Sequence, residues 1–141
     1  MMESKKIMLR IVPKEVINMI ESMSIEEKVG QMVVVGIEGN TINDHIKKLI
    51  QKYKISGFIL YKKNFKTYND MINLISELKK LNSNNKIPLM ISIDQEGGRV
   101  NRMPSEIHNL KSAHKIAENG GFDSIKEYGD ILGEILQKSR V

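Results

Sequence analysis

Residues 88–103 of the chain read PLMISIDQEGGRVNRM, and they decide the interpretation of the fold. After Pro88 comes a run of apolar, partly β-branched residues that ends at Asp94. A short apolar run bounded in this way predicts a β-strand over residues 88–94 that is buried within a sheet. A second carboxylate, two glycines and two arginines follow within eight residues of Asp94, which marks the end of this strand as a candidate functional site.

Two further apolar runs precede this strand. Residues 31–36 (QMVVVG) predict a strand that is buried on both of its faces, and residues 57–61 (GFILY) predict a second strand. The three predicted strands are short, and amphipathic segments separate them. This alternation predicts right-handed βαβ units and a parallel sheet.

Helix-start signals precede each of the three predicted strands. A Ser or Thr followed three residues later by an acid is the pattern of a capping box. The pairs are Ser24 with Glu27, Thr41 with Asp44, and Thr67 with Asp70. A proline-led helix is expected over residues 13–23, and a weaker pattern predicts another over residues 106–117. Gly120 and Gly121 then break the pattern before a last helix.

The predicted fold class is α/β. Three parallel strands leave an open sheet edge, and a complete (β/α)8 barrel typically takes about 250 residues. We therefore expect the 141-residue chain to be the N-terminal portion of an incomplete (β/α)8 TIM barrel, with about three βα units. Residues 1–141 are expected to form one partial domain, in which residues 1–22 are an N-terminal extension.

Composition excludes several classes of function. The chain has no cysteine, so disulfides, thiolate metal sites and cysteine nucleophiles are excluded. The net charge of +5 comes from dispersed lysine pairs, and only 5% of the residues are aromatic, so no nucleic-acid partner is expected. No apolar run is long enough to span a membrane, and the N-terminus lacks the pattern of a secretory signal. A cytoplasmic protein without membrane partner, metal or cofactor is therefore expected.

The loop after residues 88–94 suits a polyol ligand such as a sugar. Function in parallel sheets lies beyond the carboxyl ends of the strands, where Asp94 is expected. Gly97 and Gly98 permit a tight turn and close approach of a ligand. A carboxylate accepts hydrogen bonds from hydroxyl groups, and the guanidinium groups of Arg99 and Arg102 donate them. In the alternative interpretation Asp94 caps the following turn, and Glu96 pairs with an arginine at the surface.

The run IDQEGGRVNRM resembles the signature loop of glycoside hydrolase family 3, specifically its β-N-acetylhexosaminidase branch. Two more segments are similar to this family: MSIEEKVGQMVVVGIEG resembles its opening helix and first strand, and GFILYKKNF resembles its second strand and the following loop. The resemblance spans about residues 23–137. It implies a TIM-barrel fold and the retaining hydrolysis of terminal β-linked N-acetylglucosamine, as in the turnover of cell-wall muropeptides.

The resemblance also implies roles for single residues. Asp94 and Arg102 match the family positions that hold the non-reducing sugar. Glu96, Gly97, Gly98 and Arg99 match the loop and are expected to shape it. Asn64 matches a recurring asparagine near the site, where it either contacts the sugar or forms a turn.

Catalytic residues are not found in the sequence. The resemblance implies an aspartate nucleophile and a His–Asp acid/base pair, and the family places both downstream of the residues present. His45, His108 and His114 are expected at the surface, and Asp94 with Glu96 is too short a motif for a metal site. We therefore expect a truncated chain that is inactive by itself and binds an N-acetylglucosamine-containing glycoside. The alternatives are a small non-catalytic α/β sugar-binding module, and one half of a split enzyme whose second chain completes the barrel.

Overall fold

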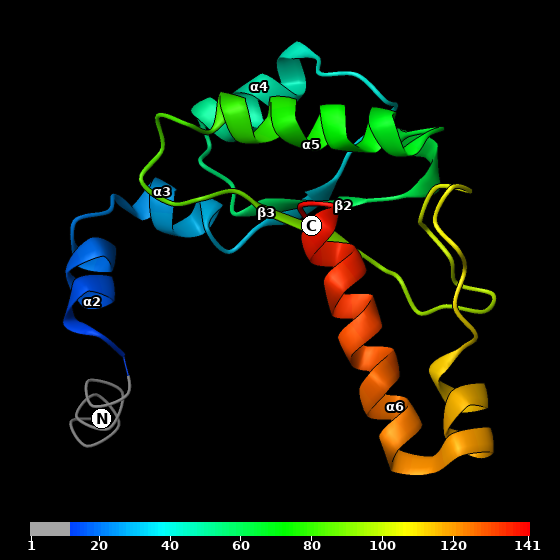
Figure 1. Ribbon diagram of the computed structural model, residues 1–141. Helices are drawn as coiled ribbons and strands as arrows, with labels where there is room; N and C mark the ends of the chain where they lie inside the picture. The colour runs from blue at the N-terminus through cyan, green and yellow to red at the C-terminus, as the bar shows by residue number, and fades with distance from the viewer. Residues whose placement is uncertain (1–11) are drawn as a thin grey trace.

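Three parallel strands form the sheet of this protein, for which a computed structural model describes residues 12–141 (Figure 1). The strands are β1 (Val34–Gly36), β2 (Gly57–Leu60) and β3 (Met90–Ile93), in the order β1-β2-β3. Val35 pairs with Phe58, and Phe58 pairs with Ile91 in the next strand. The predicted α/β class and the parallel sheet are confirmed.

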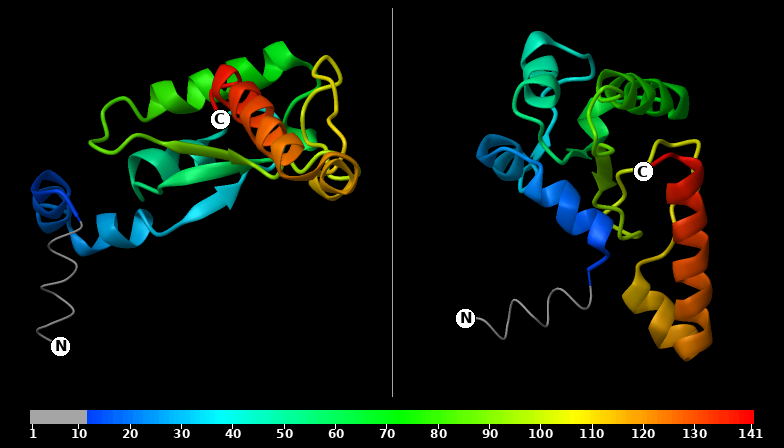
Figure 2. Two further views of the ribbon diagram at one scale, coloured as in Figure 1. Left: turned by 60° about the horizontal axis from the view of Figure 1, so that its bottom comes forward. Right: turned by 90° about the vertical axis from the view of Figure 1, so that its left-hand side faces the viewer.

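Two helices connect the strands and lie on the same side of the sheet (Figures 1 and 2). They are α4 (Asp44–Gln51), between β1 and β2, and α5 (Tyr68–Leu81), between β2 and β3. Their apolar faces pack on the alternate strand residues that point toward them, because side chains alternate between the two faces of a strand. The fully buried core includes Phe58 and Leu60 of β2, Ile50 of α4, and Met71, Ile75 and Leu78 of α5.

Two of the predicted capping boxes are present. Ser24 caps α3 (Ile25–Gly30), and the Glu27 carboxylate accepts the Ser24 main-chain N–H at 3.0 Å. Thr67 caps α5 in the same way, with Asp70 accepting the Thr67 main-chain N–H at 2.9 Å. Both boxes satisfy main-chain donors that a helix cannot satisfy internally.

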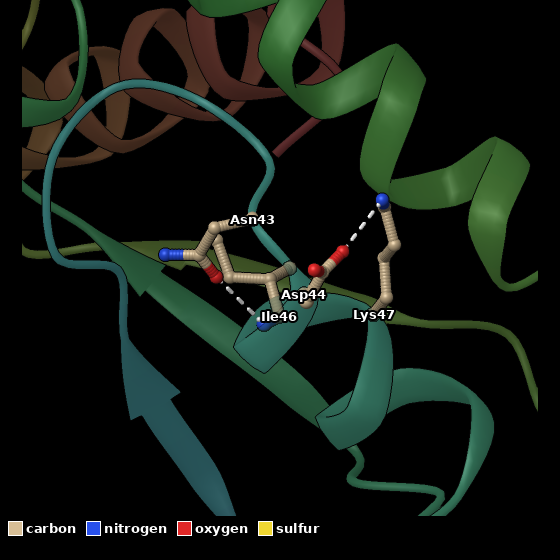
Figure 3. A network of polar contacts seen from close by, with 4 residues as sticks. All are labelled: Asn43, Asp44, Ile46 and Lys47. Carbon is tan, nitrogen blue, oxygen red and sulfur yellow. Dashed lines mark hydrogen bonds and ion pairs between the residues drawn. The ribbon is translucent and has the colours of Figure 1, made fainter.

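The third predicted helix start is wrong by two residues. α4 is capped by Asn43 and not by Thr41, because the Asn43 Oδ1 accepts the main-chain N–H of Ile46 at 2.9 Å (Figure 3). Asp44 is thus the first helical residue, and its carboxylate lies 2.9 Å from the Lys47 ammonium. An asparagine caps as well as a threonine does, so residue types alone do not decide between neighbouring starts.

The first predicted strand is shorter and more exposed than expected. Residues 31–33 form a turn after α3, where the Gln31 side-chain amide donates to Lys54 O at 2.6 Å. In β1, Val34 is 41% exposed, so the prediction of burial on both faces is wrong. The physical reason is that Val34 lies on the face of the sheet opposite α4 and α5, together with the exposed Met90, and the described residues do not cover this face.

The helix predicted over residues 106–117 begins later. Residues 104–112 form a loop, and the last helix, α6 (Ala113–Lys138), is capped by Ser112. The break expected at the two glycines is present, because Gly121 has a φ of 65° inside α6. The tail of α6 reaches α5, where the Lys79 ammonium donates to Arg140 O at 2.8 Å. Over residues 12–141, neither α6 nor another helix combines the length and apolar character that crossing a membrane requires.

The segment before the sheet contains α2 (Lys14–Glu21), which begins after Pro13 as predicted. The first eleven residues of the expected N-terminal extension lie outside the described part of the chain. On the sheet, the face opposite α4 and α5 carries Val34, Ile59 and Met90. Val34 is 41% exposed and Met90 is 50% exposed, so this second face is apolar and open to solvent.

Close backbone contact at Gly30 joins α3 to the loop before β2. A Cβ at Gly30 would lie 1.9 Å from Tyr53 O, whereas a Cβ at Gly133 in α6 would meet nothing within 4 Å. We expect Gly30→Ala to lower the free energy of unfolding by about 1–3 kcal/mol, as overpacking does. The matched control Gly133→Ala should raise it by up to about 1 kcal/mol, since alanine favours a helix interior. Urea unfolding of both variants tests this, and equal midpoints would contradict the packing described.

Candidate functional site

The carboxyl ends of the three strands lie along one edge of the sheet, and the site residues lie in the loops beyond it. Asp94 follows β3 directly. Phe58, Leu60 and Ile91 point toward the helices and are buried, so strand alternation places Asp94 on the opposite, open face. Its side chain is 48% exposed, as a ligand-binding carboxylate requires.

The structure brings Asp94 and Arg102 together. The Arg102 Nη2 lies 3.9 Å from the Asp94 Oδ2, which is a long ion pair and leaves hydrogen-bonding capacity on both groups. The Arg102 Nε is buried and has no hydrogen-bond partner within the described residues. The Arg102 side chain as a whole is 31% exposed, so its terminal guanidinium N–H groups, beside the half-exposed carboxylate, can bind a ligand that carries both acceptors and donors.

Tyr61 is the third side chain of this arrangement, and the sequence reasoning did not include it. It follows β2, and the centre of its ring lies 6.0 Å from the Arg102 Cζ. This is the distance of a cation–π contact. Tyr61 and Arg102 line a surface pocket together with Lys62 and Lys63.

The glycines of the loop permit its turns, as expected from the sequence. Gly97 and Gly98 have φ values of 76° and 59°, the region that favours glycine. The main-chain N–H of Glu96 donates to Val100 O at 3.0 Å, and that of Gly98 donates to Leu110 O at 2.7 Å. These bonds fold residues 96–110 back on themselves.

Glu96 and Arg99 are exposed and do not join the Asp94–Arg102 pair. Within residues 12–141, Glu96 forms no ion pair, and no main-chain N–H donates to the Asp94 carboxylate. The surface pairing and the turn-capping role considered from the sequence are therefore not seen here. The fixed part of Glu96 is its main chain, because its carbonyl accepts the Tyr128 hydroxyl of α6 at 2.6 Å.

Asn64 lies at the end of the short 3-10 helix η1 (Lys62–Asn64) and is 1% exposed. Its Oδ1 accepts the main-chain N–H of Tyr61 at 2.8 Å, and its Nδ2 donates to Ile37 O at 2.8 Å and to Gly39 O. The amide is thus occupied by three main-chain groups. Asn64 joins the loop after β1 to the loop after β2 and supports the position of Tyr61.

Gln95 is a second residue that sequence reasoning missed. Its Oε1 accepts the main-chain N–H groups of Arg102 at 2.7 Å and of Met103 at 3.2 Å. Gln95 stands between two carboxylates in the sequence, and its residue type does not indicate a partner seven or eight residues away. Only the folded loop identifies this contact.

Glu106 holds the other end of the loop against α5. Its Oε1 accepts the Tyr68 main-chain N–H at 3.1 Å. The main-chain N–H groups of Glu106 itself and of Tyr68 keep the pKa of the Glu106 carboxyl below its usual value, because they stabilise the charged form. Glu106 was expected at the start of a helix, but its carboxylate instead accepts a main-chain N–H at the start of α5.

The three histidines are exposed, as the sequence predicted. His114 lies 3.2 Å from Glu118, one turn along α6. No group of three His, Cys, Asp or Glu side chains gathers in the described part of the chain in a way that suits a metal ion.

Comparisons with known proteins agree on one family. A family model described as "Glycosyl hydrolase family 3 N terminal domain" matches residues 24–139. A Beta-hexosaminidase of Photobacterium profundum is 30% identical over 105 residues, which cover 74% of this chain and 30% of that protein. A Beta-hexosaminidase of Actinobacillus pleuropneumoniae serotype 5b (strain L20) is 29% identical over 91 residues, which cover 62% of this chain and 26% of that protein.

Solved structures give the same result. The glycoside hydrolase family 3 beta-N-acetylglucosaminidase from Paenibacillus sp. str. FPU-7 matches with a TM-score of 0.77 and 28% identity, over 84% of this chain and 23% of that chain. NagZ from Neisseria gonorrhoeae, in complex with N-trifluoroacetyl-D-glucosamine, matches with a TM-score of 0.57 and 26% identity, over 67% of this chain and 28% of that chain. This chain spans less than a third of the length of these relatives.

The loop geometry at Gly97 is testable by a matched pair of glycines. Gly97 and Gly39 both have positive φ, 76° and 84°, but a Cβ at Gly97 would lie 2.6 Å from Lys111 O, whereas Gly39 has open space. Both alanine variants carry the backbone strain, so their difference isolates the clash. We expect Gly97→Ala to cost about 1–3 kcal/mol more free energy of unfolding than Gly39→Ala. Equal losses in chemical denaturation would contradict the loop packing.

Proposed function

Because the chain belongs to the glycosyl hydrolase family 3 N-terminal domain family, we propose that it supplies the sugar-holding part of a β-N-acetylhexosaminidase. This enzyme would remove terminal β-linked N-acetylglucosamine by hydrolysis. The observation that carries the proposal is the Asp94–Arg102 arrangement at the carboxyl end of β3, in which the two side chains are 48% and 31% exposed and lie 3.9 Å apart. The names of the relatives, beta-hexosaminidase and beta-N-acetylglucosaminidase, support the substrate class.

Asp94 and Arg102 offer complementary groups to a sugar. The Asp94 carboxylate accepts hydrogen bonds from neighbouring hydroxyl groups, and the guanidinium of Arg102 donates to a hydroxyl or carbonyl oxygen. Hydrogen bonds to charged groups contribute about 1.5–3 kcal/mol each, which is more than neutral pairs contribute. The pair therefore orients a sugar ring at the edge of the sheet, where the remaining loops of a barrel would meet.

We place the hydrolytic chemistry outside these residues. The resemblance implies an aspartate nucleophile and a His–Asp acid/base pair, which the family places downstream of the residues present, and His45, His108 and His114 are exposed at the surface. The described residues thus bind and orient the sugar. By itself the 141-residue chain would be an inactive part of an incomplete (β/α)8 barrel.

The open face of the sheet favours further βα units beside this chain. Val34 and Met90 are 41% and 50% exposed on the face that a closed barrel buries, and β1 and β3 each pair on one side only among the described strands. The missing units would belong to the same polypeptide or to a second chain of a split enzyme. A cell-wall muropeptide fragment in the cytoplasm is the substrate and the location we propose.

Sugar binding is tested on the isotope-labelled chain by titration with N-acetylglucosamine. We expect amide signals of residues 94–102 to shift, and affinity to fall about tenfold to a hundredfold in Asp94→Asn and in Arg102→Lys, which loses the guanidinium fork. The control Asp130→Asn, an exposed acid of α6, should bind as the parent does. An unchanged affinity in Asp94→Asn would refute the assignment, and rapid hydrolysis of 4-nitrophenyl N-acetyl-β-glucosaminide by this chain would refute its inactivity.

Completion of the barrel by other strands is tested at the exposed sheet face. In Met90→Asp a charge would be buried when further βα units close the barrel over this face, whereas the chain alone tolerates it because Met90 is 50% exposed. We expect the variant to fold alone but to lose association with, or activity of, a polypeptide carrying the remaining βα units. Activity equal to that of the parent in such a complex would contradict the proposal.

A further inference from the structure

We propose that Gln95 is a positioning residue that fixes Arg102 against the end of β3. The Gln95 Oε1 accepts the Arg102 main-chain N–H at 2.7 Å. The same oxygen accepts the Met103 N–H at 3.2 Å. The consequence for sugar binding rests on the proposed function, whereas the consequence for the position of Arg102 does not.

Gln95 links Arg102 to the same strand end that carries Asp94. Asp94 and Gln95 are adjacent, and the Gln95 main-chain N–H donates back to Ile93 O at 3.1 Å, in a tight turn at the end of β3. Both residues of the proposed sugar site are therefore held by the end of β3. Asp94 is attached to it through the main chain, and Arg102 through its hydrogen bond to the Gln95 side chain. Sites supported by regular secondary structure keep their geometry better than sites on free loops.

The Arg102 N–H depends on Gln95. Residues 101–103 lie in a loop without helix or strand pairing, and within the described residues no other acceptor is found for this N–H. The next residue, Met103, is 1% exposed and lies in the core, and its main-chain N–H also contacts the Asn101 side chain. Without Gln95, the main chain at Arg102 would lose its one defined partner while Met103 stays anchored.

Tyr61 supports the other end of Arg102. The ring lies 6.0 Å from the guanidinium carbon, and Asn64 holds the Tyr61 main chain. Arg102 is thus fixed at its main chain from the loop after β3 and at its guanidinium from the loop after β2. Because two different loops support Arg102, we infer that the arrangement maintains the position of the guanidinium relative to Asp94.

Two substitutions separate the hydrogen bond from the shape of the side chain. Gln95→Glu keeps an acceptor oxygen at the same distance, and Gln95→Met keeps the length but removes the acceptor. We expect hydrogen exchange of the Arg102 amide to be about tenfold faster in Gln95→Met, with exchange at Ile59 in β2 unchanged. In Gln95→Glu the Arg102 exchange should stay within about threefold of the parent. In Gln95→Asn the side chain is too short for its oxygen to reach the Arg102 N–H. This variant should behave like Gln95→Met, and it is used instead if Gln95→Met does not fold.

The sugar titration adds the functional readout. We expect the dissociation constant for N-acetylglucosamine to rise about tenfold in Gln95→Met and to recover in Gln95→Glu. Unchanged Arg102 exchange in a folded Gln95→Met variant would overturn the inference, and so would faster exchange with unchanged affinity. If the parent chain shows no sugar binding, the proposed function fails, and the exchange result alone then decides whether Gln95 positions Arg102.

Discussion

The pairing of β2 with strands on both sides is the interaction on which the rest of the structure depends. Phe58 and Leu60 are fully buried between the sheet and the helices, and β2 pairs with β1 along one edge and with β3 along the other. This register places the carboxyl ends of three strands at one edge. The loops that follow them, and therefore the side chains of the proposed site, lie together because of it.

Side-chain contacts within and between these loops form the site. Asn64 joins the loop after β1 to the loop after β2, Tyr61 contacts the guanidinium of Arg102, and Gln95 accepts the Arg102 main-chain N–H. Asn64 and Gln95 provide hydrogen-bond partners for main-chain groups of these loops, as buried polar groups require. The half-exposed Asp94 carboxylate and the exposed part of the Arg102 guanidinium keep hydrogen-bonding capacity for a ligand.

Local signals in the sequence predicted much of this arrangement. The strands at β2 and β3, the capping boxes at Ser24 and Thr67, and the turn at Gly97 and Gly98 follow from short-range preferences, and each is present. Asp94 follows its strand directly as expected, because Pro88 and the polar residues from Asp94 onward bound a short run with β-branched residues. The contacts of Gln95 were missed and the role of Asn64 was left open, since residue types do not show which main-chain groups a folded loop brings to a side-chain amide.

Three wrong predictions share one cause. Burial of β1 on both faces, the helix over residues 106–117 and the cap at Thr41 were each inferred from residue types alone. The structure leaves one face of β1 open, directs the Glu106 carboxylate to the Tyr68 N–H of α5, and selects Asn43 to cap α4. Asn43 caps as well as Thr41 would, and the open sheet face and the contact of Glu106 arise only in the complete fold, so the residue types did not decide between the alternatives.

By itself the sequence determined most of the segments that become strands and helices, and the residue types of the candidate site, because periodicity and capping act over a few residues. The tertiary structure decided that Arg102 lies beside Asp94, that Gln95 holds it there, and that Val34 and Met90 remain exposed. These features depend on how the loop after β3 folds against the sheet and on which surfaces find a partner. Such pairing is a property of the whole fold, and no short stretch of residues encodes it.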